Sequence, residues 1–184
     1  MNVDVLFNPK KVTFCGIKTW QTWTALYMLE RILWKDRDIK RVVELGTARG
    51  GLALFMGVHL KLRDGMLLTL DVRRLVDNKW IEQASRFNVK FEQKDVFDSE
   101  TVEEVRGFIS NHRTLIFCDN GDKPRELQTY SKILKPNDLI MAHDWGKEIK
   151  REDLTAEILS ILEPYRQEDF DSLKTRILSM RRKL

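Results

Sequence analysis

The sequence predicts an α/β fold with three layers, in which helices cover both faces of a mostly parallel central sheet. β-prone apolar runs alternate with helical segments five times along the chain, a pattern typical of parallel sheets. Some runs, such as residues 114–118, contain no polar interruption, as expected for a strand that is covered on both sides. Most of the runs end at an acidic residue or a glycine turn, which places polar groups at one edge of the sheet.

The predicted elements follow one another in order. The predicted strands are a short extended piece at 11–15, then 42–44, 66–71, 89–93, 114–118, 139–142 and 175–180. The predicted helices are 19–34, a helix that begins at 52, then 76–87, 99–110, 124–134 and 151–162. In the first helix, Trp20, Trp23 and Trp34 recur at helical spacing, which favours a core position for them; the alternative is that Trp20 and Gln21 cover a ligand.

The length and composition suit one domain of residues 1–184, with residues 1–35 as an N-terminal cap and helix. Hydrophobic residues make up 42% of the chain and charged residues 33%, which excludes disordered and fibrous classes. The apolar runs are too short to cross a bilayer and the first residues lack a secretory signal, so we expect a cytoplasmic protein without membrane contact. Cys15 and Cys118 are expected to be buried, reduced thiols.

The string ELGTARGG (residues 44–51) joins a buried strand to a helix through a glycine turn. Glycine allows positive φ and close approach of a ligand, and the first turn of the following helix offers free N–H groups. This arrangement predicts a site for a polar small molecule; the alternative is a tight connection without a ligand. Asp71 ends the next strand, about 20 residues after Gly50, where an acid accepts hydrogen bonds from ribose hydroxyls. The alternative is that Asp71 only caps the following turn.

Ligands of open α/β sheets bind outside the carboxyl ends of the strands. The residues expected at that edge are Glu44, Gly46, Asp71, Asp95, Asp119, His143 and Asp144. Because a row of acids repels itself, we expect ligands or cations to compensate their charge.

The ELGTARGG string followed by Asp71 resembles the S-adenosylmethionine site of class I methyltransferases. Its G-x-x-x-G-G spacing differs from the G-x-G-x-x-G of nicotinamide and flavin enzymes. Gly16 with Trp20-Gln21, residues 119–123 and a strand that leads to Asp144 further resemble, in this order, the cephalosporin hydroxylase and macrocin O-methyltransferase-like group. The resemblance covers residues 14–146 and implies a three-layer Rossmann-like methyltransferase fold.

The resemblance also implies which residues would bind S-adenosylmethionine and a divalent metal, Mg²⁺ or Mn²⁺. The implied cofactor residues are Glu44, Gly46, Thr47, Gly50, Gly51, Asp71, Asp95 and Asp119. Of these, Gly46 and Gly50 would face the methionine portion, Asp71 the ribose and Asp95 the surroundings of the adenine. The implied metal ligands are Asp119, His143 and Asp144. The group usually shows two adjacent acids where this chain has His143-Asp144, and imidazole favours softer ions than Mg²⁺.

Methyl transfer to a hydroxyl oxygen needs a deprotonated and oriented nucleophile. A metal at Asp119 and Asp144 would lower the pKa of that hydroxyl, and Lys123 or His143 would take the proton. The group tends to carry histidine near the position of Lys123. The alternatives are that Lys123 only belongs to the turn before the helix at Pro124, and that His143 is a core or supporting residue.

The leading hypothesis is an S-adenosylmethionine-dependent O-methyltransferase that acts on a saccharide or another small hydroxylated molecule. A net charge of +4 also admits a nucleic-acid methyltransferase, although the chain has no Asn-Pro-Pro-Tyr-type string. A third hypothesis is a non-catalytic nucleotide-binding module of the same fold, favoured by the missing acid at position 143. A homo-oligomer would help to close an open acceptor pocket.

Overall fold

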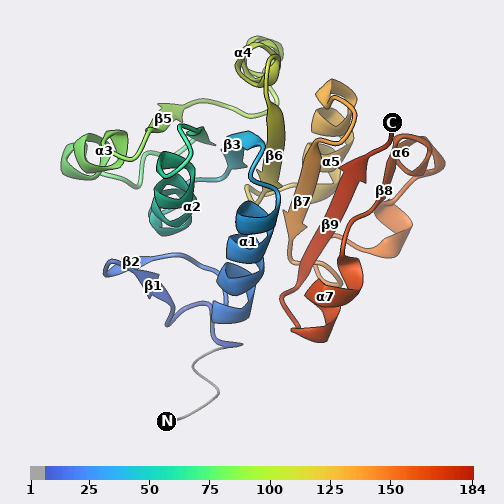
Figure 1. Ribbon diagram of the computed structural model, residues 1–184, viewed down its shortest axis with the longest axis horizontal. Coiled ribbons are helices and arrows are strands. Elements are labelled where there is room, and N and C mark those ends of the chain that lie inside the picture. Colours follow the sequence, from blue (N-terminus) through green and yellow to red (C-terminus); the bar gives the residue numbers. More distant parts are fainter. Residues whose placement is uncertain (1–6) are drawn as a thin grey trace.

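Seven strands form one sheet in the computed structural model, which describes residues 7–184 (Figure 1). In spatial order they are β5 (Val89–Gln93), β4 (Met66–Asp71), β3 (Ile39–Leu45), β6 (Arg113–Cys118), β7 (Leu139–His143), β9 (Ile177–Arg182) and β8 (Leu162–Pro164). The first five strands pair in parallel, whereas β9 runs antiparallel to both β7 and β8. The predicted mostly parallel sheet is therefore confirmed.

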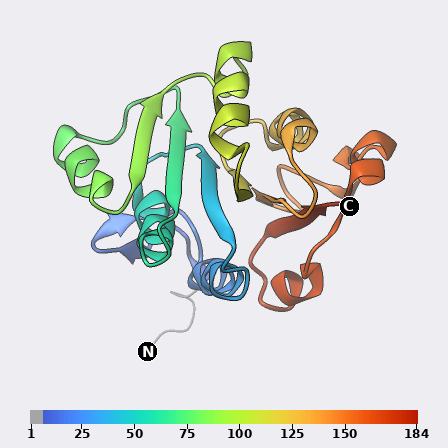
Figure 2. The same ribbon diagram turned by 45° about the horizontal axis from the view of Figure 1, so that its top comes forward.

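Helices cover both faces of this sheet because the strands alternate their side chains between two apolar cores. In β3, for example, Val42 belongs to one core and Val43 to the other. The first core is covered by α1 (Trp23–Lys35), α2 (Gly51–Lys61), α3 (Asn78–Ser85) and α7 (Gln167–Ser172). The second is covered by α4 (Ser99–Ile109), α5 (Lys123–Tyr130) and α6 (Ala156–Ile161) (Figure 2). The three-layer prediction is confirmed.

A small hairpin precedes the first helix. Its strands, β1 (Thr13–Phe14) and β2 (Ile17–Lys18), pair in antiparallel fashion and lie against the start of α2. The approach is close, because a Cβ added to Gly51 would lie 2.4 Å from the carbonyl oxygen of Lys18. The N-terminal cap predicted for residues 1–35 also includes residues 1–6, which lie outside the described residues.

The first helix begins later than predicted. Thr22 caps it, since its hydroxyl accepts a hydrogen bond from the Ala25 N–H at 3.1 Å, so the residues at 19–21 precede the helix. The predicted core position of the tryptophans is wrong. Trp20, Trp23 and Trp34 are 37%, 41% and 62% exposed, and the buried face carries the aliphatic residues instead.

The other predicted boundaries differ most toward the C-terminus. The helix predicted at 124–134 ends at Tyr130 and continues as a 3₁₀ turn, Ser131–Ile133. The helix predicted at 151–162 is a 3₁₀ turn, Arg151–Asp153, followed by α6, which Thr155 caps. β8 and α7 occupy a stretch for which no element was predicted, and β9 begins two residues later than expected.

Two further observations concern the cysteines and membrane-spanning helices. Cys118 is buried as predicted, but Cys15 is exposed because it lies in the hairpin turn, and neither forms a disulfide. Between residues 7 and 184, no helix combines the length and apolar character that crossing a membrane would require.

The two central strands, β3 and β6, send their following helices to opposite faces of the sheet, which opens a crevice between their ends. The loops after the two strands are in close contact. The Asp119 N–H donates to the Leu45 carbonyl at 2.8 Å, and a Cβ added to Gly46 (φ +104°) would lie 2.4 Å from the Asp119 carbonyl oxygen. Only glycine fits at position 46 without displacing the other loop.

We expect Gly46→Ala to lower the free energy of unfolding by roughly 1–3 kcal/mol, because the methyl group overpacks against the Asp119 backbone. Chemical denaturation measures this change. Gly107→Ala is the matched control: this α4 glycine has no neighbour within 4 Å of an added Cβ, so alanine should stabilise the helix by about 0.5–1 kcal/mol. Equal stability of Gly46→Ala and wild type would contradict the close approach.

Candidate functional site

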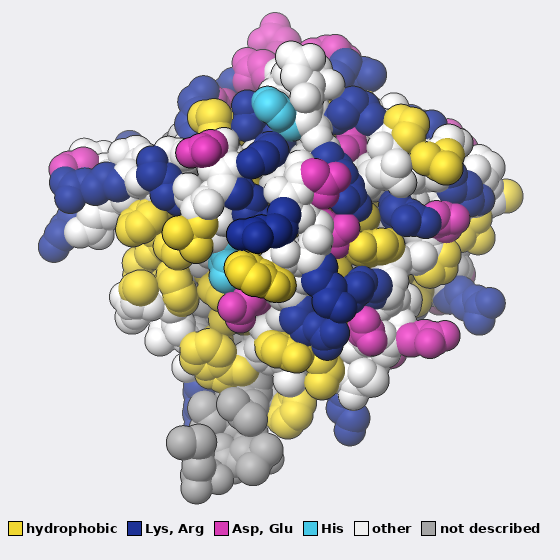
Figure 3. Space-filling model, in the orientation of Figure 1, with side chains coloured by type: hydrophobic (Ala, Val, Ile, Leu, Met, Phe, Trp, Pro, Cys, Tyr) yellow, Lys and Arg dark blue, Asp and Glu magenta, His cyan; other side chains and the backbone are white. Residues whose placement is uncertain are grey.

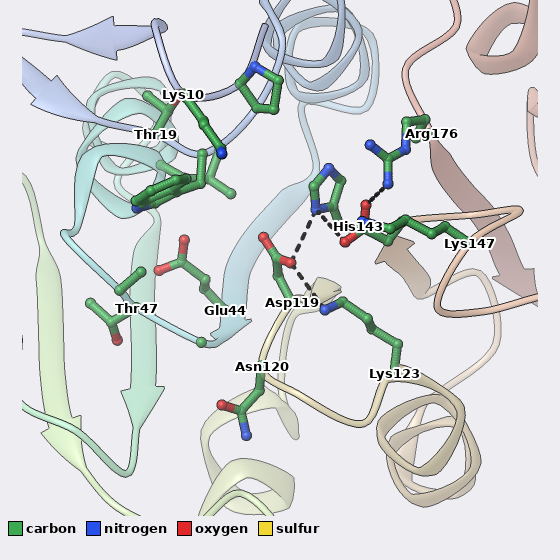
Figure 4. A pocket seen from close by; sticks show the side chains of 16 residues that line it. Lys10, Thr19, Glu44, Thr47, Asp119, Asn120, Lys123, His143, Lys147 and Arg176 are labelled. Atoms are coloured by element: carbon green, nitrogen blue, oxygen red, sulfur yellow. Dashed lines mark hydrogen bonds and ion pairs between the residues drawn. The ribbon is translucent and has the colours of Figure 1, made fainter.

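A cavity of about 320 Å³ lies at the carboxyl ends of β3, β6 and β7. Most of the residues that the sequence singled out line this cavity, namely Glu44, Gly46, Thr47, Asp119, Lys123, His143 and Asp144. Figure 4 shows that the side chains of Glu44, Asp119 and His143 converge from the ends of three separate strands. The structure thus brings together residues that are up to 100 positions apart in the sequence.

The predicted ribose and adenine residues lie outside the lining of this cavity. Asp71 is 3% exposed and accepts two backbone hydrogen bonds at 2.9 Å, from Ala48 on one carboxylate oxygen and from Arg73 on the other. It therefore caps its own turn and also holds the glycine turn in place. Each of its oxygens keeps a second lone pair for a ligand hydroxyl. Asp95 is exposed and accepts a hydrogen bond from the Phe97 N–H at 2.9 Å.

The last two glycines of the turn are required by packing. Gly50 takes a left-handed conformation (φ +80°) just before α2, and a Cβ there would lie 2.3 Å from the ring of Trp80. Gly51 faces the hairpin, as described above. These contacts position the first turn of α2 and its free N–H groups beside the loop that follows β3.

Glu44 is a buried carboxylate without a cationic partner in the described part of the chain. It is 1% exposed and accepts a hydrogen bond from the Thr69 hydroxyl, which lies 2.6 Å from the hydroxyl of Thr47. Burial raises the pKa of Glu44 well above its ordinary value, and the charges of Asp119 and Asp71 raise it further, against the lowering effect of the Thr69 hydrogen bond. A positively charged ligand in the cavity would compensate this group.

Asp119 is held by three side chains, and Figure 4 shows two of them, His143 and Lys123. The amide of Gln21 donates to Oδ2 at 2.8 Å, and Nδ1 of His143 lies 3.1 Å from Oδ1. Nζ of Lys123 is 3.6 Å from the same Oδ1. This arrangement orients the imidazole of His143, which is only 7% exposed.

Asp144 has a cationic partner that the sequence analysis missed. The guanidinium of Arg176, which directly precedes β9, forms an ion pair with Oδ1 of Asp144. The backbone of Asp144 is left-handed (φ 62°), and its carbonyl accepts from the Lys147 and Glu148 N–H groups at 2.9 and 3.0 Å. Only the antiparallel pairing of β9 with β7 brings Arg176 to this position, so no local sequence signal indicated it.

The structure argues against Lys123 as a proton acceptor. Its Nζ donates to Oε2 of Glu148 at 2.8 Å, and the residue is only 4% exposed. Burial lowers the pKa of Lys123, but the hydrogen bond to Glu148 and the charges of Asp119, Glu148 and Glu126 outweigh burial and raise it above its ordinary value. Lys123 is therefore a permanent cation at neutral pH, and its effect on the site is electrostatic.

Glu126 is a second supporting residue that the sequence analysis missed. It is fully buried and accepts backbone hydrogen bonds from Asn120, Gly121 and Asp122 at 3.3, 3.1 and 3.2 Å. Burial raises its pKa to about 7. The carboxyl group of Glu126 thus fixes the loop that carries Asp119. Its place in the first turn of α5, four residues after the N-cap Asp122, is a signal that could have indicated this role.

The three predicted metal ligands lie close together, with Nδ1 of His143 3.1 Å from Oδ1 of Asp119 and 3.8 Å from Oδ2 of Asp144. Their carboxylates are nevertheless engaged by Gln21, Lys123 and Arg176. Across residues 7–184, no group of three or more histidine, cysteine, aspartate or glutamate side chains is arranged to hold a metal ion. As arranged, these residues do not fit a divalent ion, and metal binding by them stays a prediction.

Comparison with known families decides the classification. Residues 8–156 match the family described as rhamnosyl O-methyltransferase/CmcI. The chain belongs to this family. Membership confirms the resemblance found in the sequence, and with it the assignment to the class I S-adenosylmethionine-dependent O-methyltransferases.

Several solved structures have a similar fold. The apo structure of CmcI superposes with a TM-score of 0.72 at 16% identity, over 95% of this chain and 77% of that chain. A CmcI structure described as holding Mg and SAM gives 0.71 at 17% identity, over 95% and 78%. A putative O-methyltransferase from Klebsiella pneumoniae gives 0.50 at 20% identity, over 77% and 63%. A search of curated proteins found no match.

We expect Glu44→Gln to stabilise the protein at pH 8 by on the order of 1 kcal/mol relative to wild type. The pKa of Glu44 is higher in the folded state than in the unfolded state. The free energy of unfolding of wild type therefore falls as pH rises from the unfolded pKa through the folded one, whereas the neutral amide of the variant avoids this loss. Denaturation at pH 5 and pH 8 measures it: the gain should shrink at pH 5. Glu168→Gln, at an exposed position, is the control and should change little. A gain that is independent of pH would contradict the raised pKa.

Proposed function

We propose that this protein transfers the methyl group of S-adenosylmethionine to a hydroxyl oxygen of a saccharide. The observation that carries the proposal is Glu44, a buried carboxylate beside the glycine turn that has no cationic partner among residues 7–184. The cofactor supplies the missing positive charge, because its sulfonium is cationic whereas the thioether of the product, S-adenosylhomocysteine, is neutral. The family description, rhamnosyl O-methyltransferase, supports a saccharide acceptor.

The strand order supports one orientation of the cofactor. Asp71 ends β4 and Asp95 follows β5, on one side of β3. Asp119 follows β6 and His143 ends β7, on the other side. Neighbouring strands are about 4.8 Å apart, so these two groups serve opposite ends of an extended ligand. We place the adenosine portion over β4 and β5, the methionine portion at Gly46, and the acceptor over β6 and β7.

In this orientation His143 is the proposed base. Its Nδ1–H donates to Asp119, a tautomer that we assign from the hydrogen-bond partner, and this leaves a lone pair on Nε2. As the acceptor oxygen forms its bond to the methyl carbon, the carbon–sulfur bond breaks and its electron pair stays on sulfur. Nε2 takes the hydroxyl proton, and Asp119 stabilises the resulting imidazolium. Gln21 and Lys123 keep Asp119 in position.

Trp20 supports a saccharide as the acceptor. It lines the cavity, is 37% exposed and has a left-handed backbone (φ 56°), a conformation that a bulky side chain rarely adopts. Lys18 lies 5.2 Å from the ring centroid but does not line the cavity, so the other ring face remains for a ligand. A pyranose ring presents apolar C–H groups that suit such a face.

A nucleic-acid acceptor has less support. On the face shown in Figure 3, Lys and Arg side chains gather near the middle, but acidic side chains lie among them. A surface for the phosphate backbone is expected to present a continuous basic stripe.

The experiment that tests the proposal is turnover of S-adenosylmethionine with methyl α-L-rhamnopyranoside, followed by release of S-adenosylhomocysteine. His143→Asn should reduce turnover by about 10²–10⁴-fold, because the asparagine amide can replace the Nδ1–H donor but not the Nε2 base. Binding of S-adenosylhomocysteine should be unchanged. His112→Asn is the matched control, since His112 precedes β6 at the opposite edge of the sheet.

Undiminished turnover by His143→Asn would exclude His143 as the base. If wild type binds S-adenosylhomocysteine but methylates neither the rhamnoside nor other saccharides, the proposal for the acceptor fails and the non-catalytic binding module becomes the better account.

A further inference from the structure

The two acids at the acceptor end of the cavity each have a cation of the chain as partner. Asp119 faces Nζ of Lys123 at 3.6 Å, and Asp144 forms its ion pair with Arg176. Three of the four side chains are largely shielded from water: those of Asp119 and Asp144 are 16% and 14% exposed and that of Lys123 is 5% exposed, whereas that of Arg176 is 41% exposed. Shielding strengthens the attraction relative to that of an exposed pair.

Lys123 is fixed in this position by a second acid. Glu148 accepts a hydrogen bond from its Nζ at 2.8 Å, so the ammonium group lies between Asp119 and Glu148. α5 begins at Lys123, and Pro124 at its first turn presets the backbone there. The position of the cation is thus determined by the fold as well as by charge.

Each of the two acids has a cation of the chain beside it, although Lys123 is shared with Glu148, whose side chain is 44% exposed. Two carboxylates, Asp119 and Asp144, face two permanent cations, Lys123 and Arg176. A divalent ion added between the acids would lie beside the ammonium and guanidinium groups that already contact them, and its two positive charges would repel both. Two unit charges 4 Å apart interact with about 1 kcal/mol even at the dielectric constant of water, and more where water is excluded.

We propose that Lys123 and Arg176 occupy the place of a divalent cation in this chain, so that a metal ion reaches Asp119 and Asp144 only by displacing them. A structural neighbour of the same family is described as holding Mg and SAM, so the metal is the feature in which this chain departs from that protein. The inference rests on the proposed function in one respect: the proposed function places these acids beside the site of methyl transfer.

The test is titration of the protein with Mn²⁺, with the free ion measured by electron paramagnetic resonance, in the presence of saturating S-adenosylhomocysteine. We expect Lys123→Met and Arg176→Met each to bind Mn²⁺ at least about tenfold more tightly than wild type, since each removes one repelling charge and frees one acid. Two variants are used because the buried Lys123 contributes to packing, whereas the side chain of Arg176 is 41% exposed and tolerates replacement.

Lys147→Met is the matched control. Lys147 lines the same cavity but forms no ion pair with the acids in the described part of the chain, so its replacement should leave Mn²⁺ affinity at the wild-type value. Equal Mn²⁺ affinity in wild type, Lys123→Met and Arg176→Met would overturn the inference. Calorimetric titration with S-adenosylhomocysteine on the same four proteins, without metal, checks the cofactor site separately and so distinguishes failure of the proposed function.

Discussion

The contact between Gly46 and the backbone of Asp119 is the constraint on which the site depends. It joins the loops after the two central strands at the point where the chain direction over the sheet reverses, and it leaves no space for a side chain at position 46. Because Asp119 is fixed there by its own backbone hydrogen bond to Leu45, its carboxylate reaches His143 on the next strand. The glycine is thus as important to the acceptor end of the site as to the cofactor end.

The charges divide the site into two parts. At the cofactor end, Glu44 is buried without a cation, which costs stability but favours a cationic ligand. At the acceptor end, Asp119 and Asp144 already have Lys123 and Arg176 as partners before any ligand binds. A cofactor that loses its sulfonium charge on reaction would interact strongly before transfer and more weakly afterwards, which favours release of the product.

Much of this could be predicted from local sequence. Strands that are buried on both faces produce uninterrupted apolar runs, and parallel strands bring their terminal acids to one edge. The sequence therefore predicted that Glu44, Asp119 and Asp144 lie near one another, and all three line the same cavity. Their partners could not be predicted, because Gln21 and Arg176 are 98 and 32 residues away from the acids they contact. Helical spacing alone also predicted buried tryptophans in α1. They are exposed, because aliphatic residues at adjoining positions of the helix fill the core. β8 has only three residues, and α7 has six that are mostly polar, so neither carries a periodic signal.

Calorimetric titration with S-adenosylhomocysteine, at neutral pH and without added metal, tests the central claim most directly. The account predicts saturable binding to one site in wild type. It predicts weakened binding in Asp71→Asn, because that carboxylate holds the glycine turn and is the residue proposed to bind the ribose. Absence of saturable binding in wild type would contradict the account, since the glycine turn, the buried Glu44 and the strand-end acids would then not form a cofactor site.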